Sequence, residues 1–279
     1  MSLSAWFLTH ESAIRLSCFA GTLATMAAWE ILTPRRISTI AKSTRWLNNI
    51  ALMVLYTVLV RLMFPVAALG IASFAAKRGW GLLNAIDLPI PLAIVIVIIV
   101  MDFVVWLQHV VFHAVPGLWR LHRVHHADLD YDVTTGIRFH PLEILLSMFI
   151  KSGAIALLGA PMLAVLLFEI LLNATSLFNH ANILLPTAID RGLRLLVVTP
   201  DMHRIHHSIN VQESNCNFGF NSPWWDRLFG TYQAQPQRDH QTMTIGITEY
   251  RKPRDVVLLV GLLRLPFRNT PKKAAISGH

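Results

Sequence analysis

Long apolar stretches constrain the fold of this chain more than any other feature of its sequence. Five stretches are long enough, or nearly so, to cross the roughly 30 Å of hydrocarbon in a bilayer. They cover residues 12–32, 47–71, 88–113, 142–158 and 162–178. Charged residues make up only 14% of the chain, against about 25% in an ordinary soluble domain. The sequence therefore predicts an all-α integral membrane protein with about four to five membrane helices.

The last two stretches predict a helical hairpin. Only Gly159, Ala160 and Pro161 separate them, so the chain should turn back to the membrane face that it left. Lys151 lies inside this hairpin, which leaves open whether it crosses the whole bilayer. No basic residue precedes Ser12, so the first stretch lacks the basic flank of a signal peptide and is expected to be retained.

Basic residues predict the orientation of these helices. The loop at 33–46 carries four basic residues, whereas the loop after the second stretch carries two. Because short basic loops stay in the cytoplasm, the third stretch should run inward and deliver His109 and His113 to the cytoplasmic face. The C-terminal hundred residues are expected to form a helical cap there. The net charge of +8 is assigned to anionic lipid and not to nucleic acid.

Histidines occur in three dense clusters. The sequence HVVFH places His109 and His113 at i and i+4, on one face of a helix. HRVHH at 122–126 and HRIHH at 203–207 each place three histidines at i, i+3 and i+4, within an arc of about 100°. All three clusters fall on the same predicted membrane face. This coincidence predicts metal binding, since a solvated surface cluster would explain one such word but not three.

The number and type of these ligands indicate two metal ions. A structural zinc site closes with four ligands, usually including sulfur, and neither Cys18 nor Cys216 has metal-binding or redox spacing. Eight or more imidazoles suit two iron ions with positions left open for oxygen. We therefore expect two Fe ions with O2 as co-substrate. Zinc could replace iron in purified protein, because the general order of affinity favours it.

Two further histidines lie where the hairpin meets the cytoplasmic face. His180 in LFNHAN and His140 in RFHPLE are both predicted to complete the metal sites, although His140 has the alternative of capping a helix or supporting a ligand. His10, His240 and His279 are expected to take no part. The predicted metal ligands are His109, His113, His122, His125, His126, His140, His180, His203, His206 and His207.

Three carboxylates are candidates for orienting the ligand imidazoles through hydrogen bonds. Asp102 lies about two turns before His109 on the same helix face, and it would be costly to place in a membrane helix without a partner. The others are Glu143, which follows His140 closely, and Asp226 in WWDRLFGTY, a segment that could also anchor the cap at the interface. Beyond the metal ligands, no side chain is predicted to be catalytic.

The order HxxxH, HxxHH, hydrophobic hairpin and HxxHH resembles the fatty-acid hydroxylase/sterol desaturase family of membrane di-iron oxygenases. The flanking segments strengthen this resemblance, which covers about residues 100–232. They are FHPLE at 139–143, NHAN at 179–182, TPDMHRIHH at 199–207 and NFGFNSPWWDRLFGTY at 217–232. The chain departs from the family pattern at Val110, where Arg is frequent, and at Trp106, where Tyr is frequent. Neither departure removes a ligand.

The resemblance implies a membrane bundle with a cytoplasmic helical cap and two metals between them. It implies O2-dependent hydroxylation or desaturation of an aliphatic C–H bond in a lipid held among the helices. Residues 88–235 would form the catalytic region, between N-terminal membrane helices at 1–87 and a C-terminal cytoplasmic segment and tail at 236–279. The chain has no dinucleotide fingerprint, so we expect a separate electron donor, a ferredoxin or cytochrome with its reductase. A bacterial inner membrane is the expected location.

Two other classes of function remain open at this point. A metal transporter would also combine apolar helices with HxxxH, but its sites lie near the bilayer midplane on broken helices, whereas these clusters follow the spans. The other class is a non-catalytic histidine-rich scaffold. The identity of the lipid, and the choice between hydroxylation and desaturation, stay open as well.

Overall fold

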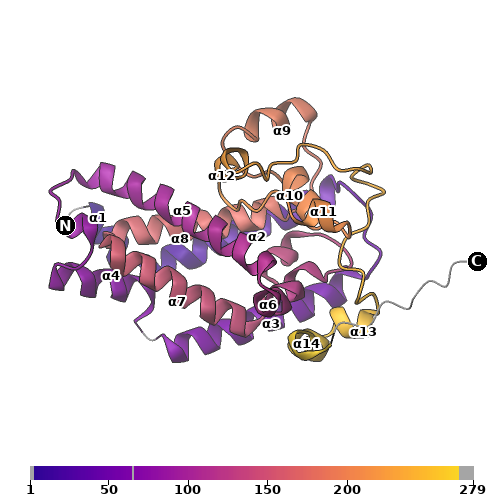
Figure 1. Cartoon of the computed structure of the whole chain (residues 1–279), viewed down its shortest axis with the longest axis horizontal. Coiled ribbons are helices and arrows are strands. Elements are labelled where there is room, and N and C mark those ends of the chain that lie inside the picture. Colours follow the sequence, from indigo (N-terminus) through magenta and orange to yellow (C-terminus); the bar gives the residue numbers. More distant parts are fainter. Residues whose placement is uncertain (1–2, 65, 270–279) are drawn as a thin grey trace, which may run out of the picture.

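The computed structural model describes residues 3–64 and 66–269, and no β-strand occurs among them. The predicted all-α fold is confirmed (Figure 1). The end of the predicted tail, with His279, lies outside the described residues. The longer helices are α2 (Glu11–Leu32), α3 (Lys42–Met63), α4 (Ala67–Arg78), α5 (Ile90–Ala114), α6 (Pro116–His126), α7 (Pro141–Leu158) and α8 (Met162–Asn179).

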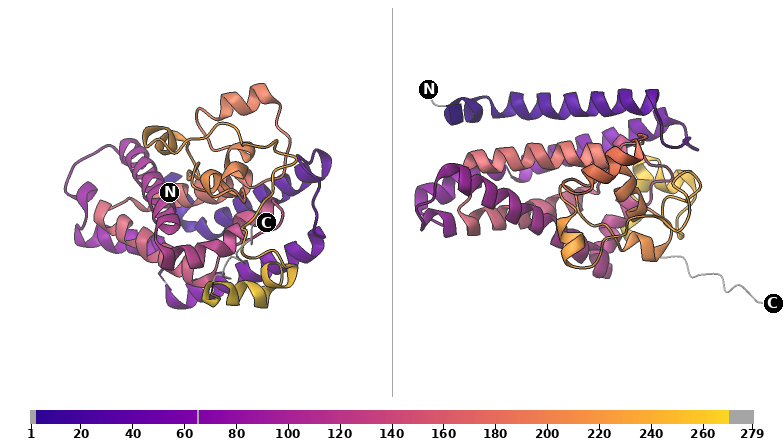
Figure 2. Two further views of the ribbon diagram at one scale, coloured as in Figure 1. Left: turned by 45° about the vertical axis from the view of Figure 1, so that its right-hand side comes forward. Right: turned by 90° about the horizontal axis from the view of Figure 1, so that it is seen from above.

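Short helices make up the rest of the described secondary structure. The α-helical ones are α1 (Leu3–Thr9), α9 (Thr187–Leu193), α10 (Pro200–His206), α11 (Val211–Ser214), α12 (Trp224–Leu228), α13 (Pro253–Val256) and α14 (Leu259–Arg264). Three 3-10 turns are η1 (Leu82–Asn84), η2 (Val133–Ile137) and η3 (Leu265–Phe267). Most of these short elements follow α8 and form the predicted helical cap (Figure 2).

Within the described part of the chain, four segments are long and apolar enough to cross a membrane: Lys42–Asn84, Ile90–Ala114, Pro141–Leu158 and Met162–Asn179. The predicted count of about four to five is therefore confirmed. The first apolar stretch is helical but is not among the four. Its helix, α2, carries Glu11, Arg15 and Glu30, and Arg15 forms an ion pair of 2.6 Å with Glu169 of α8. This ion pair attaches α2 to α8. It also gives the charge of Arg15 a partner, without which a charged side chain is costly in a membrane helix.

The second apolar stretch does not form the single helix predicted at 47–71. Helix α3 ends at Met63 and α4 begins at Ala67, with Pro65 between them. Proline lacks the backbone N–H and clashes with the carbonyl four residues earlier, so a continuous helix through this position is unfavourable.

Helices α7 and α8 form the predicted hairpin, and both have 18 residues. Helix α7 ends at Leu158 and is capped by Gly159, whose φ of +65° lies in the left-handed region that glycine tolerates without strain. A Cβ at Gly159 would also lie 2.7 Å from the carbonyl oxygen of Trp80. Pro161 then precedes α8 with a φ already suited to a helix start. The equal lengths return the chain to the end of the bundle from which it departed.

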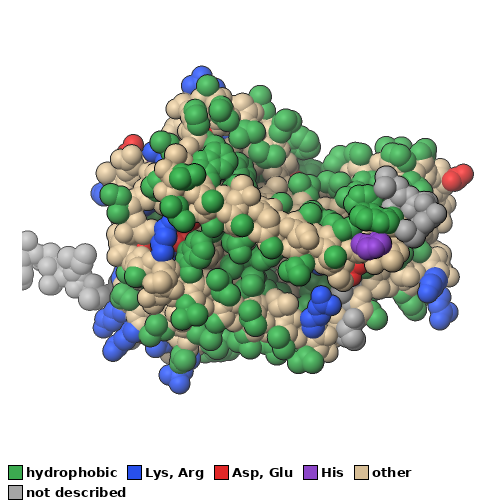
Figure 3. All heavy atoms as spheres, turned by 180° about the vertical axis from the view of Figure 1, so that it is seen from behind, with side chains coloured by type: hydrophobic (Ala, Val, Ile, Leu, Met, Phe, Trp, Pro, Cys, Tyr) green, Lys and Arg blue, Asp and Glu red, His purple; other side chains and the backbone are tan. Residues whose placement is uncertain are grey.

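The C-terminal ends of α5 and α8 and the first turn of α7 meet at one end of the bundle, beside α6, α10 and α11 (Figure 1). Apolar side chains cover much of the face shown in Figure 3, as lipid contact requires. Inside, α4, α5, α7 and α8 enclose a cluster that we call the apolar core. Its buried members are Ala68, Ala72, Val97, Met101, Val105, Met148, Ile155, Ala160, Ala164, Val165, Phe168 and Phe220.

A buried ion-pair network joins α3 to the segment that follows α6. The guanidinium of Arg45 is fully buried and donates to both carboxylate oxygens of Asp128 at 2.9 and 2.6 Å, and also to Asp132. Burial raises the pKa of Asp128, but the charges of Arg45 and Arg138 outweigh it and lower the pKa to about 2. The network fixes the turn directly after His126.

Replacing Arg45 with Ala should destabilise the protein by about 3–5 kcal/mol, because it leaves two buried carboxylates without their cation. The measurement is thermal unfolding in detergent micelles. The matched control is Arg61→Ala, which removes an exposed arginine of the same helix and should change stability by less than about 0.5 kcal/mol. Equal effects of the two substitutions would contradict this account of the network.

Candidate metal centre

Nine of the ten predicted ligand histidines gather in two groups at this end of the bundle. In each group, one imidazole nitrogen of every member lies within 4.8 Å of the others. Group A contains His109, His113, His122, His126 and His206, and group B contains His125, His180, His203 and His207. Of these nine, only His113 is not fully buried.

The two HxxHH words divide their histidines between the groups in opposite ways. In HRVHH, which ends α6, the i and i+4 histidines join group A and the i+3 histidine joins group B. In HRIHH, which ends α10, the i+3 histidine joins group A and the other two join group B. Both helices therefore border both groups. The groups are adjacent, since the rings of His126 and His207 stack with centroids 4.5 Å apart.

The spacing of the nitrogens fits metal ligation. Nε2 of His126 lies 3.1 Å from Nε2 of His113 and 3.2 Å from Nε2 of His122. In group B, the Nε2 atoms of His125 and His180 are 3.2 Å apart. Two nitrogens bound at right angles to one metal, each at about 2.1 Å, would be about 3.0 Å apart. The side chains thus converge as ligands of a common ion do.

Unpartnered nitrogens in group B support the same conclusion. Both ring nitrogens of His203 and His207, and Nδ1 of His125, are buried without a hydrogen-bond partner. Burying a polar atom without a partner is costly, and a metal ion would supply one to each ring. The donor set is entirely imidazole nitrogen, which suits iron or zinc.

Hydrogen bonds on the outer side of the rings orient several of these histidines. The Nδ1 atoms of His109, His206 and His180 donate to the carbonyl oxygens of Phe218, Cys216 and Ser176, each at 2.7 Å. A carbonyl can only accept, so Nδ1 carries the hydrogen and Nε2 keeps its lone pair for the group. Outer contacts of this kind fix the tautomer and the ring orientation of metal ligands.

Burial also keeps the imidazoles neutral. It lowers the pKa of His122 and of His180 to about 3. Burial together with neighbouring imidazoles lowers the pKa of His125, His126 and the three histidines of HRIHH well below the usual value. Their lone pairs are therefore available at neutral pH, as metal binding requires.

Two of the three candidate carboxylates support group A from outside its cluster of imidazoles. Oε1 of Glu143 is 2.6 Å from Nδ1 of His122, so this carboxylate orients a ring of group A directly. Asp226 acts one step further out, because it accepts hydrogen bonds from the backbone N–H groups of Phe218 and Gly219 at 2.9 and 2.8 Å. It thereby fixes the segment whose carbonyl accepts from His109.

Asp102 has other partners than the imidazole expected from the sequence. It accepts hydrogen bonds from Ser222 Oγ at 2.5 Å and from Trp225 Nε1 at 3.0 Å. These bonds join α5 to the segment around α12, so Asp102 connects the span to the cap.

His140 is the one predicted ligand that lies outside both groups. It occupies the N-cap of α7, where its Nδ1 accepts a hydrogen bond of 3.2 Å from the backbone N–H of Leu142. This geometry matches the capping alternative. His10 and His240, which were expected to take no part, also lie outside the groups, against Trp6 and Asp201 respectively.

The contacts that sequence reasoning missed are mostly backbone contacts. The carbonyls of Cys216 and Phe218 orient two histidines, yet carbonyls leave no trace in a sequence. The one local signal is Asn217, whose φ of +54° falls where asparagine is tolerated better than most residues. Its side chain donates to the carbonyls of Met202 and Gln233, which holds the turn between the two contacts.

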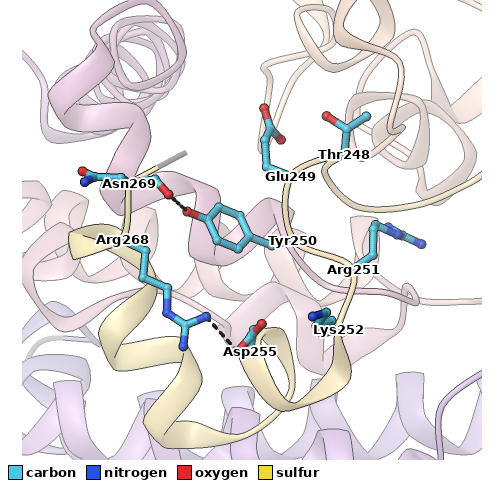
Figure 4. A pocket seen from close by; sticks show the side chains of 8 residues that line it. All are labelled: Thr248, Glu249, Tyr250, Arg251, Lys252, Asp255, Arg268 and Asn269. Carbon is cyan, nitrogen blue, oxygen red and sulfur yellow. Dashed lines mark hydrogen bonds and ion pairs between the residues drawn. The ribbon is translucent and has the colours of Figure 1, made fainter. Parts of the chain in front are cut away.

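A surface pocket of about 540 Å³ lies apart from the histidines (Figure 4). Arg268 and Asp255 pair across it at 2.7 Å, and the Tyr250 hydroxyl donates to the carbonyl of Asn269. The Tyr250 ring lies 5.0 Å from the guanidinium of Arg123 on α6, the helix that carries HRVHH. No grouped histidine lines this pocket.

The match to a family model agrees with this geometry. Residues 94–231 match the model described as "Fatty acid hydroxylase", and this range contains all nine grouped histidines. Residues 94–231 belong to the fatty acid hydroxylase family. The resemblance drawn from the histidine words is confirmed. No solved structure gave a significant match.

Curated relatives of this fatty acid hydroxylase region act on several lipids, according to their names. Ornithine lipid hydroxylase OlsE of Rhizobium tropici is 31% identical over 57% of this chain and 47% of that protein. Alkylglycerol monooxygenase of Homo sapiens is 30% identical over 49% of this chain and 30% of its own length. Cholesterol 25-hydroxylase of Homo sapiens is 27% identical over 48% of each. The chain thus spans about half, or less, of the curated relatives that it matches.

Substituting His180 and His140 separately should distinguish a ligand from a cap. We expect His180→Ala to lose metal from group B, since only three histidines would remain there. His140→Asn keeps a capping side chain at the start of α7 and should retain all bound metal. The measurement is the metal-to-protein ratio of the purified variants by mass spectrometry. Metal loss in His140→Asn would instead restore His140 to the ligand set.

Replacing Glu143 with Gln should weaken metal binding by about 10–100-fold, because the carboxyl group that orients the His122 ring is replaced by an amide. The midpoint of metal removal by a competing chelator measures this change. Glu169→Gln is the control: Glu169 is a buried glutamate of the same hairpin that pairs with Arg15 and contacts no histidine. An unshifted midpoint in Glu143→Gln would show that the contact does not support the metal.

Proposed function

We propose that this chain is a membrane-bound hydroxylase that uses two iron ions and O2 to oxidise an aliphatic carbon of a lipid. The observation that carries the proposal is the pair of adjacent, buried, all-histidine groups at one end of an apolar bundle. The fatty acid hydroxylase match and the lipid-hydroxylating relatives support it. Their names favour hydroxylation over desaturation.

Each histidine group would hold one metal ion, group A with five imidazoles and group B with four. When bound, the two irons would supply the O2-dependent oxidation of a C–H bond that no protein side chain can perform. The chain itself holds the imidazoles neutral, orients them from outside and keeps water away from the site. The apolar core beside the groups is suited to hold the hydrocarbon part of the substrate.

The reaction also requires a source of electrons. Insertion of one oxygen atom into a C–H bond, with release of the other as water, consumes two electrons and two protons. We propose a separate ferredoxin- or cytochrome-type donor with its reductase. His113 is the most exposed of the grouped histidines, and its ring lies 4.9 Å from the half-buried Trp119. The partly exposed rings of these two residues support an approach of the electron donor beside α6.

We further propose that residues 88–235 form the catalytic region, between N-terminal membrane helices at 1–87 and a C-terminal segment and tail at 236–279. A bacterial inner membrane, with the histidine end in the cytoplasm, is the proposed location, since the basic loop at 33–46 lies at that end. Both groups lie beside α6 and α10, at the ends of the apolar segments and not near their middle, which supports an oxygenase over a metal transporter.

Comparative lipid mass spectrometry of cells with and without the gene tests this function. We expect one lipid class to gain a single oxygen atom in air, and 18O2 to label that atom. His206→Ala should abolish the product while the protein still inserts into the membrane, because group A loses a ligand. If no lipid class changes during aerobic growth, the proposed function is wrong. Metal uptake by cells that depends on the same histidine would favour the transporter instead.

A further inference from the structure

We propose that Phe220 and Phe139 determine which carbon of the lipid chain is oxidised, by separating the apolar core from the histidine groups. This inference rests on the proposed function and adds to it the residues that select the reacting carbon. It also assigns the recognised part of the substrate: an extended acyl or alkyl chain, and not the polar head.

Phe220 contacts both histidine groups and the apolar core at once. Its ring centroid lies 5.0 Å from that of His109 in group A, and 5.7 and 6.4 Å from those of His203 and His180 in group B. It is also a buried member of the apolar core. No other buried member of this core in the described chain has a ring contact with a grouped histidine. Phe220 therefore lies at the boundary where hydrocarbon and metal would meet.

Phe139 occupies the same boundary on the α7 side. Its ring stacks on His125 of group B, with centroids 4.4 Å apart and planes at 13°, and lies 6.5 Å from His122 of group A. It is partly buried and packs against the apolar core. The two phenylalanines thus come from segments on either side of the hairpin and cover the core side of both groups.

Neighbouring hydrogen bonds hold the Phe220 backbone in place. The side-chain amide of Asn179, at the end of α8, donates to the Phe220 carbonyl at 2.9 Å. The next residue, Asn221, accepts from the backbone N–H of Val198 at 3.0 Å and from the hydroxyl of Thr175 at 2.5 Å. A ring on a backbone fixed in this way can act as a stop for a substrate chain, which a loosely held loop could not do.

A row of apolar side chains leads along α5 to this boundary. Val97, Met101 and Val105 are buried, belong to the apolar core and follow each other at i+4 spacing, and His109 is the next position of the same row. Residues at this spacing lie one above the other on a helix, and the row is about 18 Å long. An extended hydrocarbon chain packed along it would end at His109 and Phe220.

The composition of the core explains why the chain and not the head would be recognised. All its buried members are alanine, valine, isoleucine, methionine or phenylalanine. They offer no hydrogen bond to a polar head, so they select by shape and length. A bulky side chain at the end of such a row would halt the hydrocarbon chain of the lipid. The length of hydrocarbon that fits along the row would then decide which carbon is oxidised.

The test compares Phe220→Ala, Phe220→Trp and the control Phe19→Ala in cells grown in air. The position of the new hydroxyl in the lipid product is determined by tandem mass spectrometry, and bound metal is measured on the purified variants. The smaller and larger residues at 220 should move the hydroxyl along the chain in opposite directions while bound metal stays unchanged. Phe19 is a partly buried phenylalanine of α2 that packs against a different hydrophobic cluster and has no ring contact with a grouped histidine, so its variant should leave the hydroxyl in place.

Phe139→Leu is the second test at the boundary and should broaden the distribution of hydroxyl positions. The proposal is overturned if the wild type forms a hydroxylated lipid and the Phe220 variants oxidise the same carbon. It is also overturned if Phe19→Ala moves the hydroxyl as far as Phe220→Ala does. A wild type that forms no oxygenated lipid would overturn the proposed function itself, and the two failures are therefore distinguishable.

Discussion

The convergence of nine buried imidazoles is the constraint on which the rest of this structure depends. Their nitrogens approach one another to about 3 Å, and burial keeps imidazoles such as those of His122 and His180 neutral. Burying so many imidazoles costs hydration that must be replaced by other interactions. Metal ions inside the groups, together with the hydrogen bonds on the outside of the rings, would offset this cost. The ends of the surrounding helices and the segments next to them supply these outer hydrogen bonds.

Support for the site is layered, and each layer acts through the one inside it. Asp226 holds the backbone at Phe218, whose carbonyl accepts from His109. Asp102 ties the cap to α5 one layer further out, through Ser222 and Trp225. A carboxylate beside an apolar helix can therefore support the site without contacting a ligand histidine. Its position near a histidine word in the sequence does not reveal the layer to which it belongs.

The spacing of the histidines within each helix could be predicted from the sequence. The way in which the helices come together around the site could not. The i, i+3 and i+4 spacing of HRVHH and HRIHH depends only on helix geometry. Their opposite division between groups A and B depends on the angle at which α6 and α10 meet, which no local pattern encodes. The break between α3 and α4 was missed for a different reason, because apolar composition outweighed Pro65 in defining one stretch.

The hairpin explains how distant histidine words form a single centre. Helices α7 and α8 have equal lengths, so the chain leaves the centre after His140 and returns to it at His180. Each of the two also packs against α4 and α5, which places the apolar core between them. The same geometry thus fixes two things: the ligands of group B join those of group A, and hydrocarbon borders both groups. The hairpin therefore places the apolar core against one side of the histidine groups, while α10 and its C-cap supply three histidines from the cap.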